Sequence, residues 1–233
     1  MDNLSFSALE ETISFYTRND FAIMNHLLVG DYDGLWKYAE IAYNDNQAII
    51  NEYESGTRTV SSDYEIKWLN CLKKRIISGL DAKAKQMIIK NAKRDISNIL
   101  NAMYPSGTDL HLFRTAWIDR KDTLENNFAY SREYKSLIFD VGDILKIKSI
   151  SSYSLTPYRE EDDVGSDFYR YEIFVSKGKP ILELDQFISH NEDGEVLLPP
   201  MKCRVIDIGK SAKEKCRGIV KLAYIEPLEC DYN

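Results

Sequence analysis

Three polar sites interrupt apolar stretches in the second half of the sequence, and each is of a type that can do chemistry. Arg114 lies in "LHLFRTAW", a hydroxyl cluster lies in "SISSYSLTP", and Glu195 lies in "GEVLLPP". A guanidinium can grip an anion through a fork of charge-assisted hydrogen bonds. A carboxylate at the mouth of an apolar strand is costly unless it is paired or has a chemical task. Glu195 is therefore the first candidate for chemistry.

Each of these sites also has a purely structural explanation. An arginine on a strand usually extends its charged end to solvent. Serines at the end of a strand usually cap a turn, and a glutamate that begins a strand is usually exposed. The three sites therefore carry a functional argument only together and in their order along the chain.

The elements that must position these residues fall into two halves with different periods. Residues 1–104 show the spacing of helices, and "DFAIMNHLLVG" has Asp20 as a candidate N-cap and Gly30 as a stop. "PSG" at 105–107 ends the helical half.

Residues 108–233 contain short apolar segments separated by turn signals. We expect strands at 109–116, 136–139, 143–150, 169–176, 180–184, 194–199, 202–208 and 217–225. A short helix is compatible with 120–130, and the acidic run at 159–167 is typical of an exposed loop. The predicted class is α+β, with an N-terminal helical layer packed on a strand-rich half.

Composition excludes several classes of protein. The 233 residues are 44% hydrophobic, which is typical of a folded domain. No run approaches the ~18 apolar residues of a membrane span, and the N-terminus lacks the pattern of a secretory signal. We therefore expect no membrane partner and a cytoplasmic location, in the producing or the target cell.

Cysteines and histidines do not form a metal-binding pattern. No CxxC pair is present, and the histidines are scattered. We expect no metal, and free thiols. Neither GxGxxG nor GxxxxGK[ST] occurs, which argues against a parallel dinucleotide-binding sheet. The residues concerned are Cys71, Cys203, Cys216, Cys230, His26, His111 and His190.

Taken in order, the three polar sites resemble the Arg–Ser–Glu class of mono-ADP-ribosyltransferases, the family of clostridial Rho- and actin-modifying toxins. "GEVLLPPMKCRVIDI" is similar to the family's "EVLLPPGTKFRV" type of ending and sets the register. "LFR" resembles its "YR" strand, "SYSL" its Ser-Thr-Ser-Leu motif, and "FAIMNHLLVG" its early helix.

The resemblance covers nearly the whole chain, and it implies a fold. It implies one domain over residues 1–233, with a helical subdomain at 1–105 and a β-rich catalytic core at 106–233. In this family NAD is the co-substrate, and it lies in a cleft of a split β-sandwich.

The resemblance also implies roles for the three polar sites. Glu195 becomes the catalytic glutamate, which stabilises positive charge on the ribose carbon as nicotinamide leaves. Ser152 holds Glu195 by a hydrogen bond. Arg114 binds the diphosphate or the ribose side of NAD.

Further residues enter the predicted site by the same resemblance. Tyr153 and Ser154 line the nicotinamide side, and Tyr158 and Arg159 follow on the next loop as a stacking ring and a phosphate ligand. Phe168 and Arg170 compete for the same two tasks, and Asn25 contacts the nicotinamide end from the helical half. Tyr153 departs from the family's Thr, and Asp193 from the Glu or Gln that helps to choose the acceptor.

The acceptor is a macromolecule, and a protein side chain acted on by an intracellular toxin or effector is the leading hypothesis. Residues 64–98 hold nine basic and three acidic residues in a chain of net charge −7. Lys83, Lys90, Lys93 and Arg94, with the Lys73–Arg75 cluster, could follow a phosphate backbone, so a transferase acting on RNA or DNA in a defence or toxin–antitoxin system stays open.

Three other interpretations also stay open. The basic helices could dock an acidic partner, such as an inhibitor or antitoxin protein. The chain could be an inactive transferase-like binding module, or an unrelated α+β interaction domain.

Overall fold

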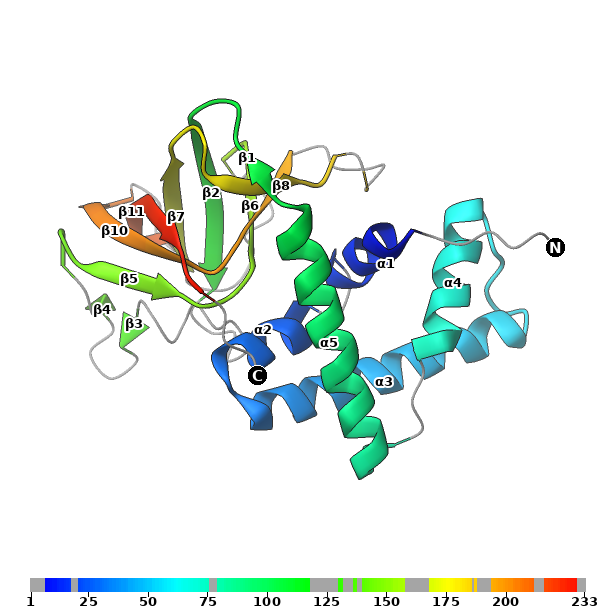
Figure 1. Cartoon of the computed structure of the whole chain (residues 1–233). Coiled ribbons are helices and arrows are strands. Elements are labelled where there is room, and N and C mark those ends of the chain that lie inside the picture. Colours follow the sequence, from blue (N-terminus) through cyan, green and yellow to red (C-terminus); the bar gives the residue numbers. More distant parts are fainter. Residues whose placement is uncertain are drawn as a thin grey trace. The chain divides into compact units, whose positions relative to one another are not determined.

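We describe the protein from a computed structural model of the whole chain (Figure 1). The residues it describes are 7–17, 21–75, 79–117, 130–131, 136–137, 140–157, 168–185, 187, 194–211 and 216–229. The chain divides into two compact units, residues 1–102 with 232–233, and residues 103–231. The first unit is helical and the second is a sheet, which confirms the α+β class. The single domain over 1–233 stays a prediction.

Five helices make up the described part of the first unit. They are α1 (Ala8–Phe15), α2 (Phe21–Val29), α3 (Tyr32–Glu54), α4 (Asp63–Arg75) and α5 (Ala82–Ala102). The helical spacing predicted for residues 1–104 is confirmed, and in α5 the buried residues Ala92, Ile96 and Ile99 follow that spacing.

Local signals start and stop these helices. Ser7 opens α1 with a capping box, in which the Ser7 amide donates to the Glu10 carboxylate at 2.7 Å. Gly30 ends α2 with a φ of +75°, as expected from the sequence. Asp31 then caps α3 by accepting from the Gly34 amide at 3.0 Å. The candidate N-cap Asp20 lies outside the described residues.

The second unit is built on a mixed sheet. Its strands are β1 (Tyr104–Pro105), β2 (Leu110–Trp117), β5 (Ile144–Ile147), β6 (Ser151–Ser154), β7 (Phe168–Val175), β8 (Pro180–Glu183), β9 (Glu195–Leu198), β10 (Met201–Gly209) and β11 (Cys216–Pro227). The order is β1-β8-β9-β6-β2-β7-β11-β10-β5, and only the β7–β11 pair is parallel. A separate hairpin joins β3 (Tyr130–Ser131) to β4 (Ser136–Leu137).

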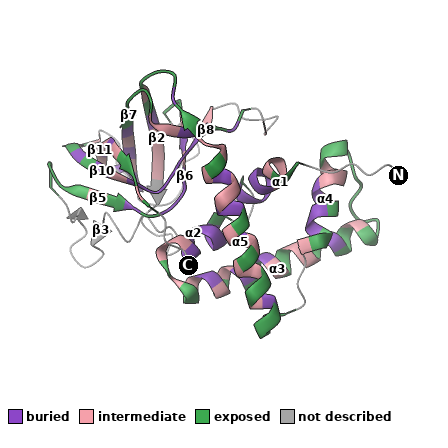
Figure 2. Ribbon diagram, in the orientation of Figure 1, coloured by how far each residue is buried: buried purple, intermediate pink, exposed green. Residues whose placement is uncertain are grey.

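One apolar core lies inside this sheet (Figure 2). Ile181 of β8 and Ile147 of β5 come from opposite ends of the strand order, yet both belong to the same buried cluster. The cluster also includes residues of every strand between these two, so the core runs along one face of the sheet from β8 to β5. Leu112, Tyr153 and Val196 point into this core, so their neighbours on β2, β6 and β9 face the other way.

Most of the expected strands are present, within a residue or two. The segment 143–150, however, is shorter than expected, because β5 ends at Ile147. The hydroxyl cluster that we expected as its end is a strand of its own, β6. Buried Ser149 and Ser151 make this possible by hydrogen bonding to each other at 3.0 Å. The short helix at 120–130 and the acidic loop at 159–167 lie outside the described residues, apart from Tyr130.

Candidate functional site

Three neighbouring strands bring the three polar sites together. Strands β2, β6 and β9 are consecutive in the sheet order and carry Arg114, Ser152 and Glu195. Ser154 of β6 lies opposite both Phe113 of β2 and Glu195 of β9. Directly opposite residues on paired strands share a face of the sheet. Glu195, Ser154 and Phe113 therefore form a row on the face that points away from the core.

The Glu195 carboxylate has a partner on the next strand. The Ser152 hydroxyl donates a hydrogen bond to it. Ser152 lies opposite Leu197, so it is the diagonal neighbour of Glu195 on the same face. Both side chains are half-buried. The bond therefore restrains the rotamer of a carboxylate that stays accessible from outside.

Arg114 is tied to the same strand through its backbone. Its Nη1 atom donates to the carbonyl oxygen of Ser152 at 2.6 Å. Its guanidinium carbon lies 5.8 Å from the centroid of the Tyr153 ring. These bonds connect Arg114 to Glu195 through Ser152. The bond between Arg114 and Ser152 joins residues 38 positions apart in the sequence, and the bond between Ser152 and Glu195 joins residues 43 positions apart. Arg114 lies opposite Tyr171 and two residues after Leu112, so its side chain leaves β2 on the core face, whereas those of Ser152 and Glu195 leave on the other face.

Tyr153 and Ser154 contribute in different ways. The Tyr153 side chain is 4% exposed and belongs to the sheet core, where it contacts Arg114. Only its backbone is offered to a site on the outer face. The Ser154 hydroxyl shares the face of Glu195 and accepts from the Thr156 amide at 3.1 Å. Ser154 therefore also caps the turn that follows β6.

The remaining predicted site residues come from other parts of the chain. Tyr158, Arg159 and Asp193 lie outside the described residues. Asn25 is a buried residue of α2, in the first unit. Of the two competitors, Phe168 is 2% exposed at the start of β7, and Arg170 is half-buried further along that strand.

Sequence reasoning missed a cluster on the same face as Glu195. The row continues from Phe113 to Glu172 of β7, whose carboxylate lies 3.1 Å from His111 Nε2. The His111 ring stacks on Phe174 with centroids 4.3 Å apart and lies 4.4 Å from Phe113. The alternation of polar and apolar residues along β2 and β7 was the available signal.

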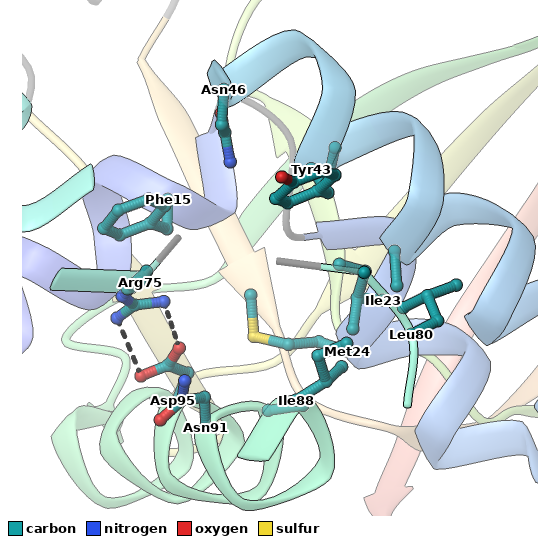
Figure 3. A pocket seen from close by; sticks show the side chains of 14 residues that line it. Phe15, Ile23, Met24, Tyr43, Asn46, Arg75, Leu80, Ile88, Asn91 and Asp95 are labelled. Atoms are coloured by element: carbon teal, nitrogen blue, oxygen red, sulfur yellow. Dashed lines mark hydrogen bonds and ion pairs between the residues drawn. The ribbon is translucent and has the colours of Figure 1, made fainter. Parts of the chain in front are cut away.

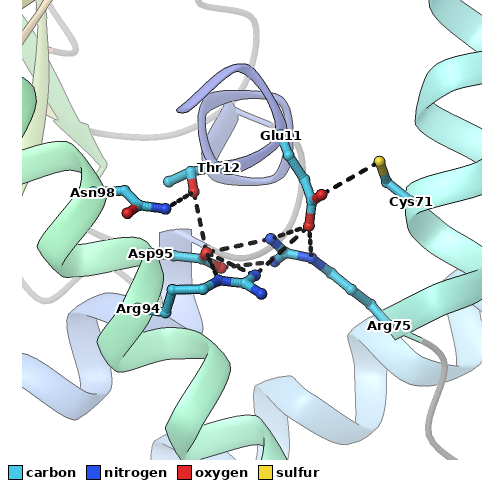
Figure 4. Close-up of polar contacts among 7 residues, drawn as sticks. All are labelled: Glu11, Thr12, Cys71, Arg75, Arg94, Asp95 and Asn98. Carbon is cyan, nitrogen blue, oxygen red and sulfur yellow. Dashed lines mark hydrogen bonds and ion pairs between the residues drawn. The ribbon is translucent and has the colours of Figure 1, made fainter. Parts of the chain in front are cut away.

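The basic segment of the first unit differs from the expected phosphate-binding face. Arg75 is 9% exposed and bridges Glu11 at 2.9 Å and Asp95 at 2.7 Å (Figure 4). Arg94 also bonds Asp95, at 2.9 Å, although it is half exposed. Arg75 therefore joins α1, α4 and α5 instead of facing solvent, which makes its place in a nucleic-acid surface wrong.

A cavity of about 60 Å³ lies between the helices of the first unit (Figure 3). Phe15, Met24, Ile88 and other apolar side chains line most of it, and the Arg75–Asp95 pair closes one side. None of the described candidates for the NAD site lines it. The cavity is therefore a separate feature from the polar chain on β2, β6 and β9.

Among the described residues, no group of three or more His, Cys, Asp or Glu side chains could hold a metal ion. In the same part of the chain, no helix has both the length and the apolar character needed to cross a bilayer.

Comparisons with solved structures identify the fold. The catalytic domain of VahC from Aeromonas hydrophila has a TM-score of 0.52 at 13% identity, covering 94% of this chain and 99% of that one. The Salmonella SpvB ATR domain gives 0.53 at 12%, covering 95% and 100%. BECa, an ADP-ribosylating toxin of a C. perfringens binary enterotoxin solved with NADH, gives 0.52 at 12%, covering 94% of this chain but 44% of its own.

No protein-family model and no curated protein matches the sequence. The chain nevertheless has the α+β fold of the ADP-ribosyltransferase toxins, as the resemblance predicted.

Proposed function

We propose that this protein is an NAD-dependent mono-ADP-ribosyltransferase that modifies a protein side chain. One observation carries the proposal: in a chain with the fold of these toxins, Ser152 donates to Glu195 on neighbouring strands. That pairing supports the catalytic assignment, because it leaves a half-buried carboxylate held in one orientation.

Glu195 would act as an electrostatic catalyst. When the cationic nicotinamide ring leaves the ribose of NAD, positive charge develops on the ribose carbon, as it does in glycoside hydrolysis. A fixed carboxylate stabilises this charge most when it does not have to reorient as the charge forms. The Ser152 hydrogen bond and the short strand β9 both favour such a fixed position.

Arg114 would bind the substrate and would also hold strand β6 through its hydrogen bond to the Ser152 carbonyl. The guanidinium has five N–H donors, and the bond to the Ser152 carbonyl uses its Nη1 group. Its positive charge suits the diphosphate of NAD, whose oxygens accept charge-assisted hydrogen bonds. We propose a carboxylate for the reacting carbon and an arginine for the phosphates, which requires NAD to reach Arg114 past the edge of β6, because the two side chains leave the sheet on opposite faces.

The first unit supports a protein acceptor over a nucleic acid. Of the basic residues expected to follow phosphates, Arg75 and Arg94 bond Asp95, and Lys73 pairs with Glu54 at 3.0 Å. These ion pairs lower the positive potential available to a nucleic acid. We further propose that the protein acts as a toxin or effector inside a target cell.

Labelled NAD added to a cell lysate tests the proposal, with the protein and RNA fractions separated afterwards. Wild type should label protein bands, and Glu195→Gln should reduce the rate by roughly 10²–10³, the cost of one preorganised electrostatic group. NAD affinity should change little, because the carboxylate acts mainly in the transition state.

Three results would contradict parts of this proposal. Label in the RNA fraction alone would replace the protein acceptor by a nucleic acid. Full activity of Glu195→Gln would remove Glu195 from its role. A wild type that neither labels the lysate nor releases nicotinamide would favour an inactive binding module.

A further inference from the structure

We propose that Gly194 and Leu155 are positioning residues that hold Glu195 in place for the reaction. The inference rests on the proposed function of Glu195, but it arises from a separate set of contacts. These contacts surround the backbone at the start of β9 and do not involve the Ser152 hydroxyl.

The backbone around Glu195 is clamped from both sides of its strand. On the β6 side, the Leu155 amide donates to the Gly194 carbonyl at 3.0 Å. On the β8 side, the Leu184 amide donates to the Glu195 carbonyl at 2.9 Å. The peptide groups on both sides of the Glu195 Cα atom are therefore fixed by neighbouring chain segments, and the direction of its side chain follows from them.

Both the backbone conformation and the surroundings of position 194 favour glycine over every other residue. Its φ is +63°, in the left-handed region that favours glycine. A Cβ atom at this position would lie 2.7 Å from Leu155 Cδ1 and 3.3 Å from Leu155 Cβ and Cγ. The Leu155 side chain thus packs directly on the bare Cα of the residue before Glu195.

The contact with Gly194 gives the exposed side chain of Leu155 a structural role. Leu155 follows the strand that carries Ser152 and is 41% exposed. The turn that presents it is held by the bond from the Thr156 amide to the Ser154 hydroxyl. Because the turn is fixed, the Leu155 side chain can act as a stop against which the Gly194 backbone rests.

A rotamer change can move Leu155 Cδ1 away from a side chain at position 194, but it leaves Leu155 Cβ only 3.3 Å from the new Cβ atom. We therefore expect part of the strain to displace the backbone that carries the Glu195 carboxylate. Any Cβ must push either the Leu155 side chain outward or the β9 backbone away from β6. A displacement of ~1 Å in a catalytic group can cost on the order of 10²-fold in rate. The effect should appear in kcat and not in NAD binding, because the clamp does not include Arg114.

The experiment compares three variants in the nicotinamide-release assay. Gly194→Ala should lower kcat by ~10- to 100-fold, with KM for NAD within about twofold of wild type. Adding Leu155→Ala should recover part of the loss, at least about threefold, because it removes the atoms that the new Cβ would strike. If position 194 matters only for stability, Gly194→Ala should lower Tm but leave the kcat of the folded protein unchanged, so kcat must be measured below the unfolding transition.

Gly178 provides the matched control. It lies in the turn between β7 and β8 with a φ of +88°, and a Cβ there would meet nothing within 4 Å. Gly178→Ala therefore carries a similar backbone strain without the contact, and it should lower Tm as Gly194→Ala does while leaving kcat unchanged.

The outcomes separate this inference from the proposed function. If wild type is active and Glu195→Gln is not, but Gly194→Ala keeps full kcat, the positioning role is wrong and the function stands. The same holds if Leu155→Ala fails to improve Gly194→Ala, or if Gly178→Ala loses as much kcat. If wild type itself releases no nicotinamide, the proposed function fails first.

Discussion

Replacing Arg75 by methionine should destabilise the helical unit far more than its position in a surface-like basic run suggests. The guanidinium is 9% exposed and bonds Asp95, whose side chain is 2% exposed, at 2.7 Å. Breaking a buried ion pair by removing one partner costs about 3–5 kcal/mol, because a charge is left buried. Asp95 keeps bonds from Arg94 and from Thr12, so we expect the lower end, about 3 kcal/mol.

The adjacent lysine run supplies a control. Lys73 lies on the same helix and pairs with Glu54 at 3.0 Å, but the two side chains are 43% and 58% exposed. Exposed pairs of this kind contribute about 0–1 kcal/mol. Lys73→Met removes the same charge from α4, so the difference between the two variants isolates burial from net charge.

Urea unfolding followed by circular dichroism at 222 nm measures both variants, since the helices lie in the first unit. The double variant Arg75→Met with Asp95→Asn should recover part of the loss, because neutralising the second partner removes the buried charge. The reasoning is refuted if Arg75→Met costs no more than Lys73→Met, or if the double variant is less stable than the sum of its single changes.

Two further predictions concern the sheet unit. Ser152→Ala should lower kcat for nicotinamide release by ~10- to 100-fold, since a hydrogen bond to a charged group contributes about 1.5–3 kcal/mol, and unchanged kcat would show that Glu195 needs no such support. Burial raises the pKa of Cys203 to about 12, so only the unfolded thiol, with an ordinary pKa of about 8.5, ionises near pH 10. The free energy of unfolding should therefore fall as pH rises from about 9 towards 12, and Cys203→Ala should flatten this decline in alkaline urea titrations.

Local patterns predicted the elements better than their arrangement. The stop at Gly30 and the buried stripe of α5 follow from the chemistry of a few neighbouring residues. Strand β6 was missed because serines favour turns, although Ser151 and Tyr153 alternate with Ser152 and Ser154 at a strand's period of two. Paired buried hydroxyls overrode that preference.

In the candidate site, too, the residue types could be predicted from the sequence, but the contacts between strands could not. Residue types and motif order pointed to Arg114, Ser152 and Glu195, and the fold places their strands side by side. The clamp of Leu155 on Gly194 could not be read from the sequence, because it depends on a register between strands that begin more than forty residues apart. His111 and Glu172 escaped notice for the same reason.

The adjacency of β2, β6 and β9 also sets when the site can form during synthesis. Its three residues come from positions 114, 152 and 195, so a nascent chain holds the arginine and the serine long before it acquires the carboxylate. Contacts of such sequence separation close slowly compared with helices. We therefore expect ribosome-bound fragments that stop before residue 195 to be inert towards NAD, and activity to emerge only late in synthesis.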